Sequence, residues 1–288
     1  MNIRSVVFEF IANRQIEKQR RMGLCFKIFL TLLGLFELNV IPSHQAGFFC
    51  NDSSISFIFE GDTVTTVILM TGLLPIFVTE MVYLDTDYLR RGRTFQALIN
   101  TVWLYRSYLY GFFFNLGVVE VLKGITGSPR PTFLDICQPD AAATCRDFEY
   151  VSSFKCTSTR FDSWLQSDSY HSFPSGHTSL SVYAALFVSW YLQRRAFDWR
   201  HRSIMLVPVL QMSYLSFAAV SSMTRITDRR HHWWDVLAGA VIGVASMYYA
   251  VLVMCKNFAY AKPNSACDAT EEGQEKSLIN DGERQYAS

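Results

Sequence analysis

Six long apolar segments constrain the fold of this 288-residue chain more than any other feature of its sequence. A transmembrane helix needs about 20 mostly apolar residues to cross the hydrocarbon core of a bilayer, and each segment approaches that length. A soluble protein of this size would have too little polar chain to cover six such segments. We therefore expect an all-α, polytopic protein with six transmembrane helices. The segments are 24–41, 64–84, 98–122, 177–192, 204–223 and 234–254.

The composition agrees with a membrane protein and excludes one class of partner. Half of the residues are apolar, 15% are aromatic, and the mean hydropathy is positive. The formal net charge is only +1, which gives no electrostatic reason to expect nucleic acid as a partner. Membrane lipids are the expected surroundings.

The distribution of Lys and Arg predicts which loops face the cytoplasm, because short cytoplasmic loops carry an excess of both. Clusters occur in the N-terminal segment and in the second and fourth loops: Arg14, Lys18, Arg20, Arg21, Arg90, Arg91, Arg93, Arg194, Arg195, Arg200 and Arg202. The first loop contains neither residue. Both termini are therefore expected in the cytoplasm, and the loops 42–63, 123–176 and 224–233 outside it. The last of these is an exception to the rule, since it contains Arg225, Arg229 and Arg230.

This topology divides the chain into a cytoplasmic segment (1–23), a six-span catalytic domain (24–257) and a polar, disordered cytoplasmic tail (258–288). Four cysteines fall in the outward loops, where an oxidising compartment permits one or two disulfides in any pairing. They are Cys50, Cys137, Cys145 and Cys156. Asn51 begins an Asn-Asp-Ser sequon and is a candidate for glycosylation.

Three segments rich in polar and charged residues meet on the outward side of this topology. The first, Lys-Gly-Ile-Thr-Gly-Ser-Pro-Arg-Pro at 123–131, begins the third loop. The second, Phe-Pro-Ser-Gly-His at 173–177, ends that loop, and the third, 225–235, fills the fifth loop. We expect the three segments to form one site.

The first two segments can bind an anion and supply a general acid. Lys123 and Arg130 place two cations at the membrane boundary, where snorkelling explains Lys123 well but explains less well an arginine held between two prolines. Ser175 and Gly176 directly precede a helix, so their backbone N–H groups can point at an anion, although Ser175 could also be a simple N-cap. His177 beside them can protonate a leaving oxygen near neutral pH.

The third segment predicts a nucleophile. His231 and Asp235 are four residues apart and would share one face if the last helix begins near His232. The carboxylate can then hold one ring nitrogen and leave the other free to attack, as in a catalytic triad. A purely structural pair is the alternative. His231, His232 and Asp235 could also bind a metal, but adjacent histidines on a helix point in different directions, so we expect no metal site.

The three segments resemble the signature of the type 2 phosphatidic acid phosphatase superfamily, KxxxxxxRP, PSGH and SRxxxxxHxxxD. Every ionisable position is present in order, with Thr224 in place of the signature serine. The stretches Phe-Cys-Asn-Asp at 49–52 and Pro-Thr-Phe-Leu-Asp-Ile-Cys at 131–137 are similar to the animal lipid phosphate phosphatases of this superfamily. The resemblance implies a helical core like that of the vanadium haloperoxidases.

The resemblance also implies a role for each residue of the site. His231 would attack phosphorus and form a phosphohistidine, Asp235 would orient it, and His177 would protonate the leaving alcohol. No cofactor or metal is implied. The residues implied to hold the phosphoryl oxygens are Lys123, Arg130, Ser175, Gly176 and Arg225.

The implied substrates are phosphatidic acid, lysophosphatidic acid, sphingosine 1-phosphate and ceramide 1-phosphate. The motifs do not distinguish among them, because they recognise the phosphate group and not the lipid. Soluble sugar phosphates and polyprenyl diphosphates are alternatives on related folds. A catalytically silent scaffolding relative is a second alternative, which the retained His177, His231 and Asp235 disfavour. Only the six spans and the charges near helix ends suggest a transporter. The site would face the outside at the plasma membrane or the lumen of an internal membrane, and a homo-oligomer is compatible with the sequence.

Overall fold

The computed structural model describes residues 27, 31, 34, 44–65, 94–197 and 203–258. The predicted spans 24–41 and 64–84 lie almost entirely outside these ranges. So do the cytoplasmic segment 1–23, the arginines of the predicted second loop, Arg200 and Arg202, and nearly all of the tail 258–288. The described part comprises the last four predicted spans and the loops next to them.

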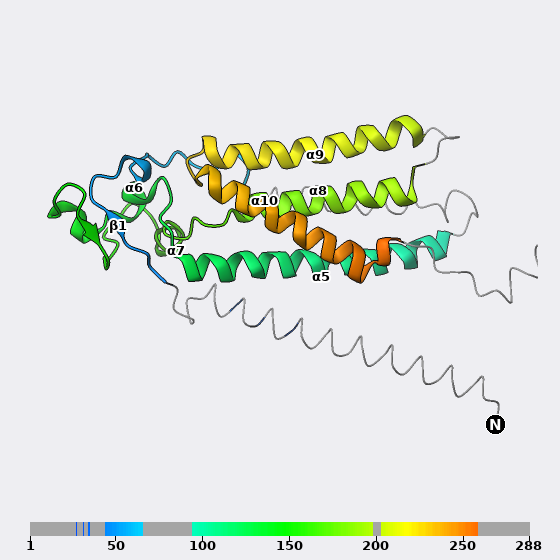
Figure 1. Ribbon diagram of the computed structural model, residues 1–288, viewed down its shortest axis with the longest axis horizontal. Coiled ribbons are helices and arrows are strands. Elements are labelled where there is room, and N and C mark those ends of the chain that lie inside the picture. Colours follow the sequence, from blue (N-terminus) through cyan, green and yellow to red (C-terminus); the bar gives the residue numbers. More distant parts are fainter. Residues whose placement is uncertain are drawn as a thin grey trace, which may run out of the picture.

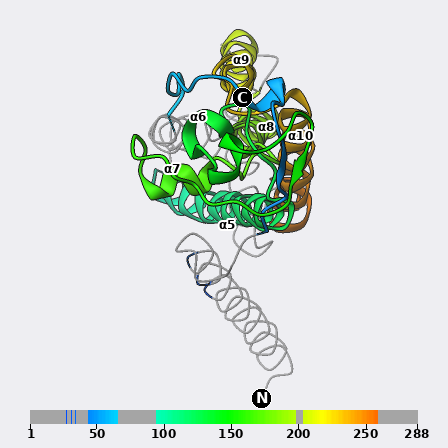
Figure 2. The same ribbon diagram turned by 90° about the vertical axis from the view of Figure 1, so that its left-hand side faces the viewer.

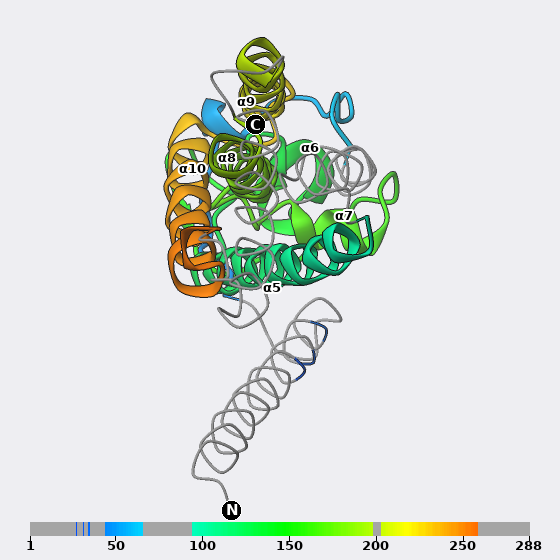
Figure 3. The ribbon, with the colours of Figure 1, turned by 90° about the vertical axis from the view of Figure 1, so that its right-hand side faces the viewer.

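Four long helices run side by side where the sequence predicts its last four spans (Figure 1). Seen from the end of the bundle, α8 is enclosed between α9, α10 and α5 (Figure 3), and it contacts all three. Most of its side chains are buried as a result. The helices are α5 (Thr94–Thr126), α8 (Gly176–Arg195), α9 (Ser203–Thr227) and α10 (Trp233–Tyr248), the last continued by a π-helical segment η3 (Tyr249–Met254) and a 3₁₀ turn η4 (Lys256–Phe258).

Three helical stretches among the described residues are long and apolar enough to cross a membrane. They are Thr101–Thr126, Ile204–Thr227 and Trp233–Met254. Large apolar side chains on α9 and α10 are exposed, as expected where a helix faces lipid: Met205, Val209, Met212, Leu237 and Val241. α8 is not among the three, because Ser, Thr, Gly and His occupy much of its first turns. Its neighbouring helices cover it instead of lipid. The chain is thus a helical membrane protein, and three of the four predicted spans that the structure describes have the required length and composition.

A reciprocal pair of hydrogen bonds fixes α5 against α8. Asn115 Nδ2 donates to the Ser179 carbonyl (3.1 Å), and Ser179 Oγ donates to Asn115 Oδ1 (2.6 Å). Both residues are fully buried, and a buried amide without partners is costly, so the pair favours one rotation of α5 about its axis. That rotation places Lys123, at the end of α5, beside the first turn of α8.

Two glycines allow α10 to approach the backbone of α8. A Cβ atom at Gly239 would lie 2.4 Å from the Ser175 carbonyl oxygen, and one at Gly243 would lie 2.5 Å from the Ser179 carbonyl oxygen. Small residues four positions apart are typical of close helix packing in membranes. The backbones of α8 and α10 are therefore in contact. These helices begin at the ends of the second and third sequence segments.

We expect Gly239→Ala to destabilise the protein by about 1–3 kcal/mol, because the added methyl group meets backbone that cannot rotate away. The matched control is Ala245→Val, which adds more volume to an exposed position of the same helix. The measurement is the melting temperature of the detergent-solubilised protein. Equal melting temperatures for Gly239→Ala and the control would contradict the close packing of α10 on α8.

A cap covers one end of the bundle, made of residues 44–65 and 127–175 (Figure 2). Its small antiparallel sheet pairs Phe48 with Val151 and Phe49 with Tyr150. Beneath the sheet, Phe48, Phe133 and Phe154 form an aromatic core. The elements of the cap are β1 (Phe48–Phe49), η1 (Ser53–Ile55), α6 (Phe133–Cys137), η2 (Asp140–Ala143), β2 (Tyr150–Val151) and α7 (Ser163–Asp168).

Two disulfides join the parts of the cap, one between Cys50 and Cys145 and the other between Cys137 and Cys156. They use all four cysteines of the predicted outward loops, in a pairing that the sequence leaves open. The first bond connects residues 95 positions apart and ties the segment before the second predicted span to the loop between α5 and α8. The two segments of the cap, 44–65 and 127–175, are therefore linked covalently.

Candidate active site

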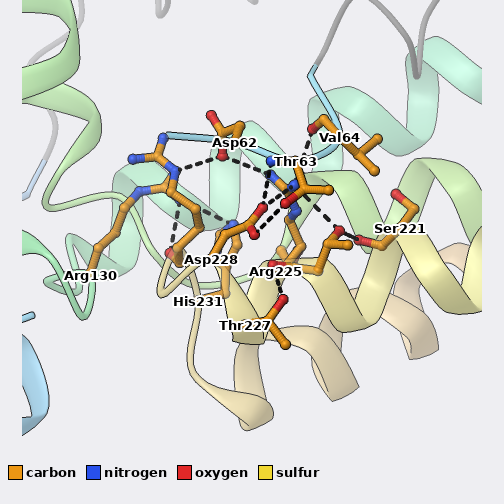
Figure 4. A network of polar contacts seen from close by, with 12 residues as sticks. Asp62, Thr63, Val64, Arg130, Ser221, Arg225, Thr227, Asp228 and His231 are labelled. Carbon is orange, nitrogen blue, oxygen red and sulfur yellow. Dashed lines mark hydrogen bonds and ion pairs between the residues drawn. The ribbon is translucent and has the colours of Figure 1, made fainter. Parts of the chain in front are cut away.

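The three sequence segments meet at the capped end of the helical bundle. Lys123 lies in the last turn of α5, and Arg130 lies in the turn that follows. His177 is the second residue of α8, Arg225 is in the last turn of α9, and His231 directly precedes the N-cap of α10. Ends of four helices thus contribute to one buried group of side chains. Figure 4 shows the part of it that surrounds Arg225 and His231.

His231 and Asp235 are buried, with exposed fractions of 4% and 0%. The last helix begins near His232 as expected, with His232 as its N-cap, but His231 lies just before the helix and not on one of its faces. The two residues still face each other, with 3.7 Å between His231 Nδ1 and Asp235 Oδ2. Hydrogen bonds from Ser172 Oγ (2.6 Å) and the His232 backbone N–H (2.9 Å) hold this carboxylate in place.

The other ring nitrogen of His231 faces Arg130, whose Nη1 lies 3.1 Å from Nε2. A guanidinium group can only donate, so Nε2 is the acceptor and the ring proton belongs on Nδ1, towards Asp235. Burial and the charge of Arg130 lower the pKa of His231 to about 3, although Asp235 acts in the opposite direction. His231 is therefore neutral at physiological pH and carries a lone pair on Nε2.

Asp168, which the sequence analysis did not single out, holds Arg130 in this position. Its Oδ1 accepts from Arg130 Nη2 (2.6 Å), and its carbonyl accepts from Arg130 Nε (2.7 Å). Its Oδ2 accepts from Arg230 Nη2 (2.7 Å), which places a further buried arginine beside the first. Burial alone would raise the pKa of Asp168, but the two guanidinium groups outweigh burial and hold it below its usual range.

Arg225 is only 1% exposed and is held by the cap (Figure 4). Its Nη1 donates to Asp62 (3.0 Å), and its Nη2 donates to the Val64 carbonyl (3.1 Å) and to Asp228 (3.0 Å). Its Nε is buried and has no hydrogen-bond partner among the described residues. Thr224 Oγ1 lies 3.4 Å from Nη2, so the hydroxyl that replaces the signature serine touches the same guanidinium.

The start of α8 differs in one respect from expectation. Ser175 is the N-cap, but its backbone N–H donates to the Asp235 carbonyl (3.0 Å) and is not available to an anion. Its Oγ accepts from the Thr178 N–H (3.5 Å) and the Thr178 hydroxyl (3.1 Å), which leaves its own proton for another acceptor. The N–H groups of Gly176 and His177 belong to the first turn and lack helical partners.

His177 and Lys123 complete the group at the start of α8. His177 lies close enough to Arg225 for the charge of the guanidinium to act on it, and its Nε2 is buried without a hydrogen-bond partner among the described residues. A Cβ atom at Gly176 would lie 3.8 Å from Lys123 Nζ, so the lysine is adjacent to this turn. Lys123 also pairs with Glu120 (2.8 Å).

The arrangement can bind an oxyanion and attack its central atom. Four cations surround a neutral imidazole with a lone pair, and each is paired with a carboxylate: Lys123 with Glu120, Arg130 with Asp168, Arg225 with Asp62 and Asp228, and Arg230 with Asp62 and Asp168. Within the ranges that the structure describes, no group of three or more His, Cys, Asp and Glu side chains is arranged to hold a metal ion. The ring of His232 stacks on Trp234, with 4.5 Å between centroids.

Comparison with known proteins gives consistent matches. The family model of the PAP2 superfamily matches residues 104–259. Phospholipid phosphatase 1 of Mus musculus is 30% identical over 258 residues, which cover 84% of this chain and 88% of the relative. Phospholipid phosphatase 2 of Rattus norvegicus is 28% identical over 247 residues, covering 82% and 86%. A putative phosphatidate phosphatase of Drosophila melanogaster is 29% identical over 246 residues, covering 77% and 64%. No solved structure matches.

Proposed function

The chain belongs to the PAP2 superfamily, and we propose on that basis that it removes phosphate from lipid phosphates through a phosphohistidine, without a metal cofactor. The observation that carries the proposal is the neutral Nε2 of His231 beside the Arg130 guanidinium, with both side chains buried. A nucleophile that already contacts a cation is placed to meet a phosphoryl group bound by that cation.

In the first step, the phosphate group of the lipid binds Lys123, Arg130 and Arg225, with donors from Ser175 Oγ and the Gly176 N–H. Nε2 of His231 then attacks phosphorus and forms the N–P bond. His177 takes up the proton of the monoanionic lipid phosphate as the substrate binds. The P–O bond to the lipid breaks with its electron pair on that oxygen, which takes this proton from His177. His231 becomes cationic in this step, and Asp235 stabilises the Nδ1–H that faces it.

In the second step, water attacks the phosphohistidine. His177, now neutral, accepts a proton from this water, the N–P bond breaks, and its electron pair returns to Nε2. Inorganic phosphate leaves and both histidines return to their starting states. Arginine cations around the phosphoryl oxygens stabilise the charge that develops in both steps, which is the main demand that phosphoryl transfer makes of a protein.

The proposed topology retains six spans within 24–257, with the cap and the site outside the cytoplasm, at the plasma membrane or in the lumen of an internal membrane. Two disulfides in the cap support an oxidising compartment. The basic fifth loop supports it as well, because its arginines serve the site and the cap. Arg225 and Arg230 are buried in ion pairs, and Arg229 lies over the Phe57 ring at 4.2 Å. Asn51 is exposed in the cap, where glycosylation could occur.

The proposed substrates are phosphatidic acid, lysophosphatidic acid, sphingosine 1-phosphate and ceramide 1-phosphate. They share a phosphomonoester next to a membrane surface, which is what the site can recognise. A silent scaffolding protein would not need a buried histidine with a directed lone pair. The assembled His231, Asp235 and Arg130 therefore favour the phosphatase.

The proposed function is tested by phosphate release from phosphatidic acid in mixed micelles. We expect the detergent-solubilised protein to release inorganic phosphate at the same rate with excess EDTA and with added Mg²⁺, because arginines take the place that a metal has in other phosphoryl transfer enzymes. The His231→Ala protein, purified in parallel, gives the background. Release that requires Mg²⁺ would contradict the metal-independent mechanism. Release at background level from phosphatidic acid, and from the other three proposed lipids in the same assay, would contradict the function.

A further inference from the structure

Three consecutive residues of the cap lie across Arg225, although they belong to none of the three sequence segments (Figure 4). Asp62 and Thr63 end the predicted first loop and Val64 follows them, and we call these three residues the strap. Asp62 is 163 positions before Arg225 in the chain, so only the fold brings them together. Every residue of the strap contacts either Arg225 or the carboxylate that holds it.

The contacts of the strap fix both terminal nitrogens of Arg225. Asp62 Oδ1 accepts from Nη1 (3.0 Å), and the Val64 carbonyl accepts from Nη2 (3.1 Å). Thr63 donates to Asp228 with its backbone N–H (2.8 Å) and its Oγ1 (2.7 Å), and Asp228 in turn accepts from Nη2 (3.0 Å). The guanidinium plane is thereby set from two sides, and Nε is the nitrogen left for another acceptor.

Asp62 also links the arginines of the site to one another. The same Oδ1 lies 3.2 Å from Arg230 Nε, and Arg230 pairs through Asp168 with Arg130. Without this carboxylate, Arg225 and Arg230 would be left as two neighbouring cations with one counterion fewer in a buried setting. Asp62 itself is partly exposed, so it faces the site from the solvent side.

We propose that Asp62 is a positioning residue, which acts through Arg225 to aim one N–H group at the phosphoryl oxygens of the substrate. This inference rests on the proposed phosphatase function and deepens it. The strap completes the phosphate site from a loop that precedes all three sequence segments. Phosphate binding therefore depends on the first loop being closed onto the bundle, and the Cys50–Cys145 disulfide anchors that loop.

Asp62→Asn tests the proposal, with Glu60→Gln as the matched control. Both changes remove a carboxylate from the same segment, but Glu60 is exposed and two positions outside the strap. We expect Asp62→Asn to lower kcat/KM for phosphatidic acid between about ten- and a hundredfold, the loss expected when a supporting contact lets a binding group shift by up to an ångström. Inhibition by orthovanadate, a mimic of the transferring phosphoryl group, should weaken in parallel.

Two further variants separate positioning from folding. Asp62→Glu keeps the charge and should recover part of the loss, while Thr63→Val removes one of two bonds to Asp228 and should cause a smaller loss than Asp62→Asn. An unchanged vanadate inhibition constant in folded Asp62→Asn would overturn the proposal, as would an equal loss in Glu60→Gln. If the unaltered protein itself released no phosphate, the proposed function would fail first. If Asp62→Asn does not fold, Asp62→Glu and Thr63→Val decide by the same vanadate constant.

Discussion

Replacing His231 with Ala is expected to lower kcat for phosphatidic acid by about 10⁴-fold or more, to the level of the background. The change removes the only proposed nucleophile, and the remaining cations can bind phosphate without cleaving the ester. The direct measurement is transfer of radiolabelled phosphate from substrate to protein after an alkaline quench in the first turnover, because acid hydrolyses the N–P bond of phosphohistidine. We expect a labelled protein that is stable to alkali for the unaltered chain and no label for His231→Ala.

The control for this experiment is His44→Ala, which removes an exposed histidine of the cap. The neighbouring His232→Ala is informative as well, because the ring of His232 stacks on Trp234 and its lone pairs have no role in the mechanism. Label retained in His231→Ala and lost in His232→Ala would show that the nucleophile is assigned to the wrong histidine. Hydrolysis of phosphatidic acid by His231→Ala at the rate of the unaltered protein would rule out a phosphohistidine at His231.

Asp235→Asn is expected to lower kcat by about 10⁴-fold, close to the effect of the same change in a serine protease triad. The reason is the tautomer of His231. An amide can offer an N–H to Nδ1, which would move the ring proton to Nε2 and occupy the attacking lone pair. The measurement is the rate of the burst of phosphohistidine formation, which should fall while the affinity for orthovanadate changes little, because Asp235 contacts none of the cations.

Ser172→Ala is the matched comparison, since it removes a hydrogen bond to Asp235 without altering the carboxylate. The His232 backbone N–H still holds Oδ2 in this variant, so the loss should be far smaller than that of Asp235→Asn. If the two variants lost activity equally, Asp235 would matter for packing and not for the tautomer of His231.

The helices were the most predictable part of the fold. α5, α9 and α10 coincide with apolar runs because lipid-facing helices must be apolar over their whole length. α8 was also predicted at the correct position, yet it is less apolar, since other helices and not lipid surround it. Gly239 and Gly243 gave no signal on their own, because only the position of α8 shows why a side chain cannot fit there.

The positions of the proposed nucleophile His231 and of its neighbouring cations were predictable, because each of them belongs to a short motif with a fixed spacing. Their carboxylate partners were not. Asp62 and Asp168 reach Arg225 and Arg130 across 163 and 38 positions, and no local pattern marks them. For the Ser175 backbone N–H the local pattern was misleading. A residue at the start of a helix is expected to have a free N–H, but this one donates to the Asp235 carbonyl of α10.

The hydrogen bond from Arg130 to His231 Nε2 has a consequence for selectivity. In the proposed mechanism, the electron pair of His231 Nε2 already accepts the Arg130 hydrogen bond in the empty site, so the imidazole is least reactive when nothing is bound. A neutral electrophile offers Arg130 no better acceptor and must compete with it for the same electrons. A phosphate dianion supplies oxygens that accept from Arg130 in place of His231. The lone pair on Nε2 is then free to attack. Discrimination between phosphate esters and other esters then begins with charge, before the lipid tail is recognised.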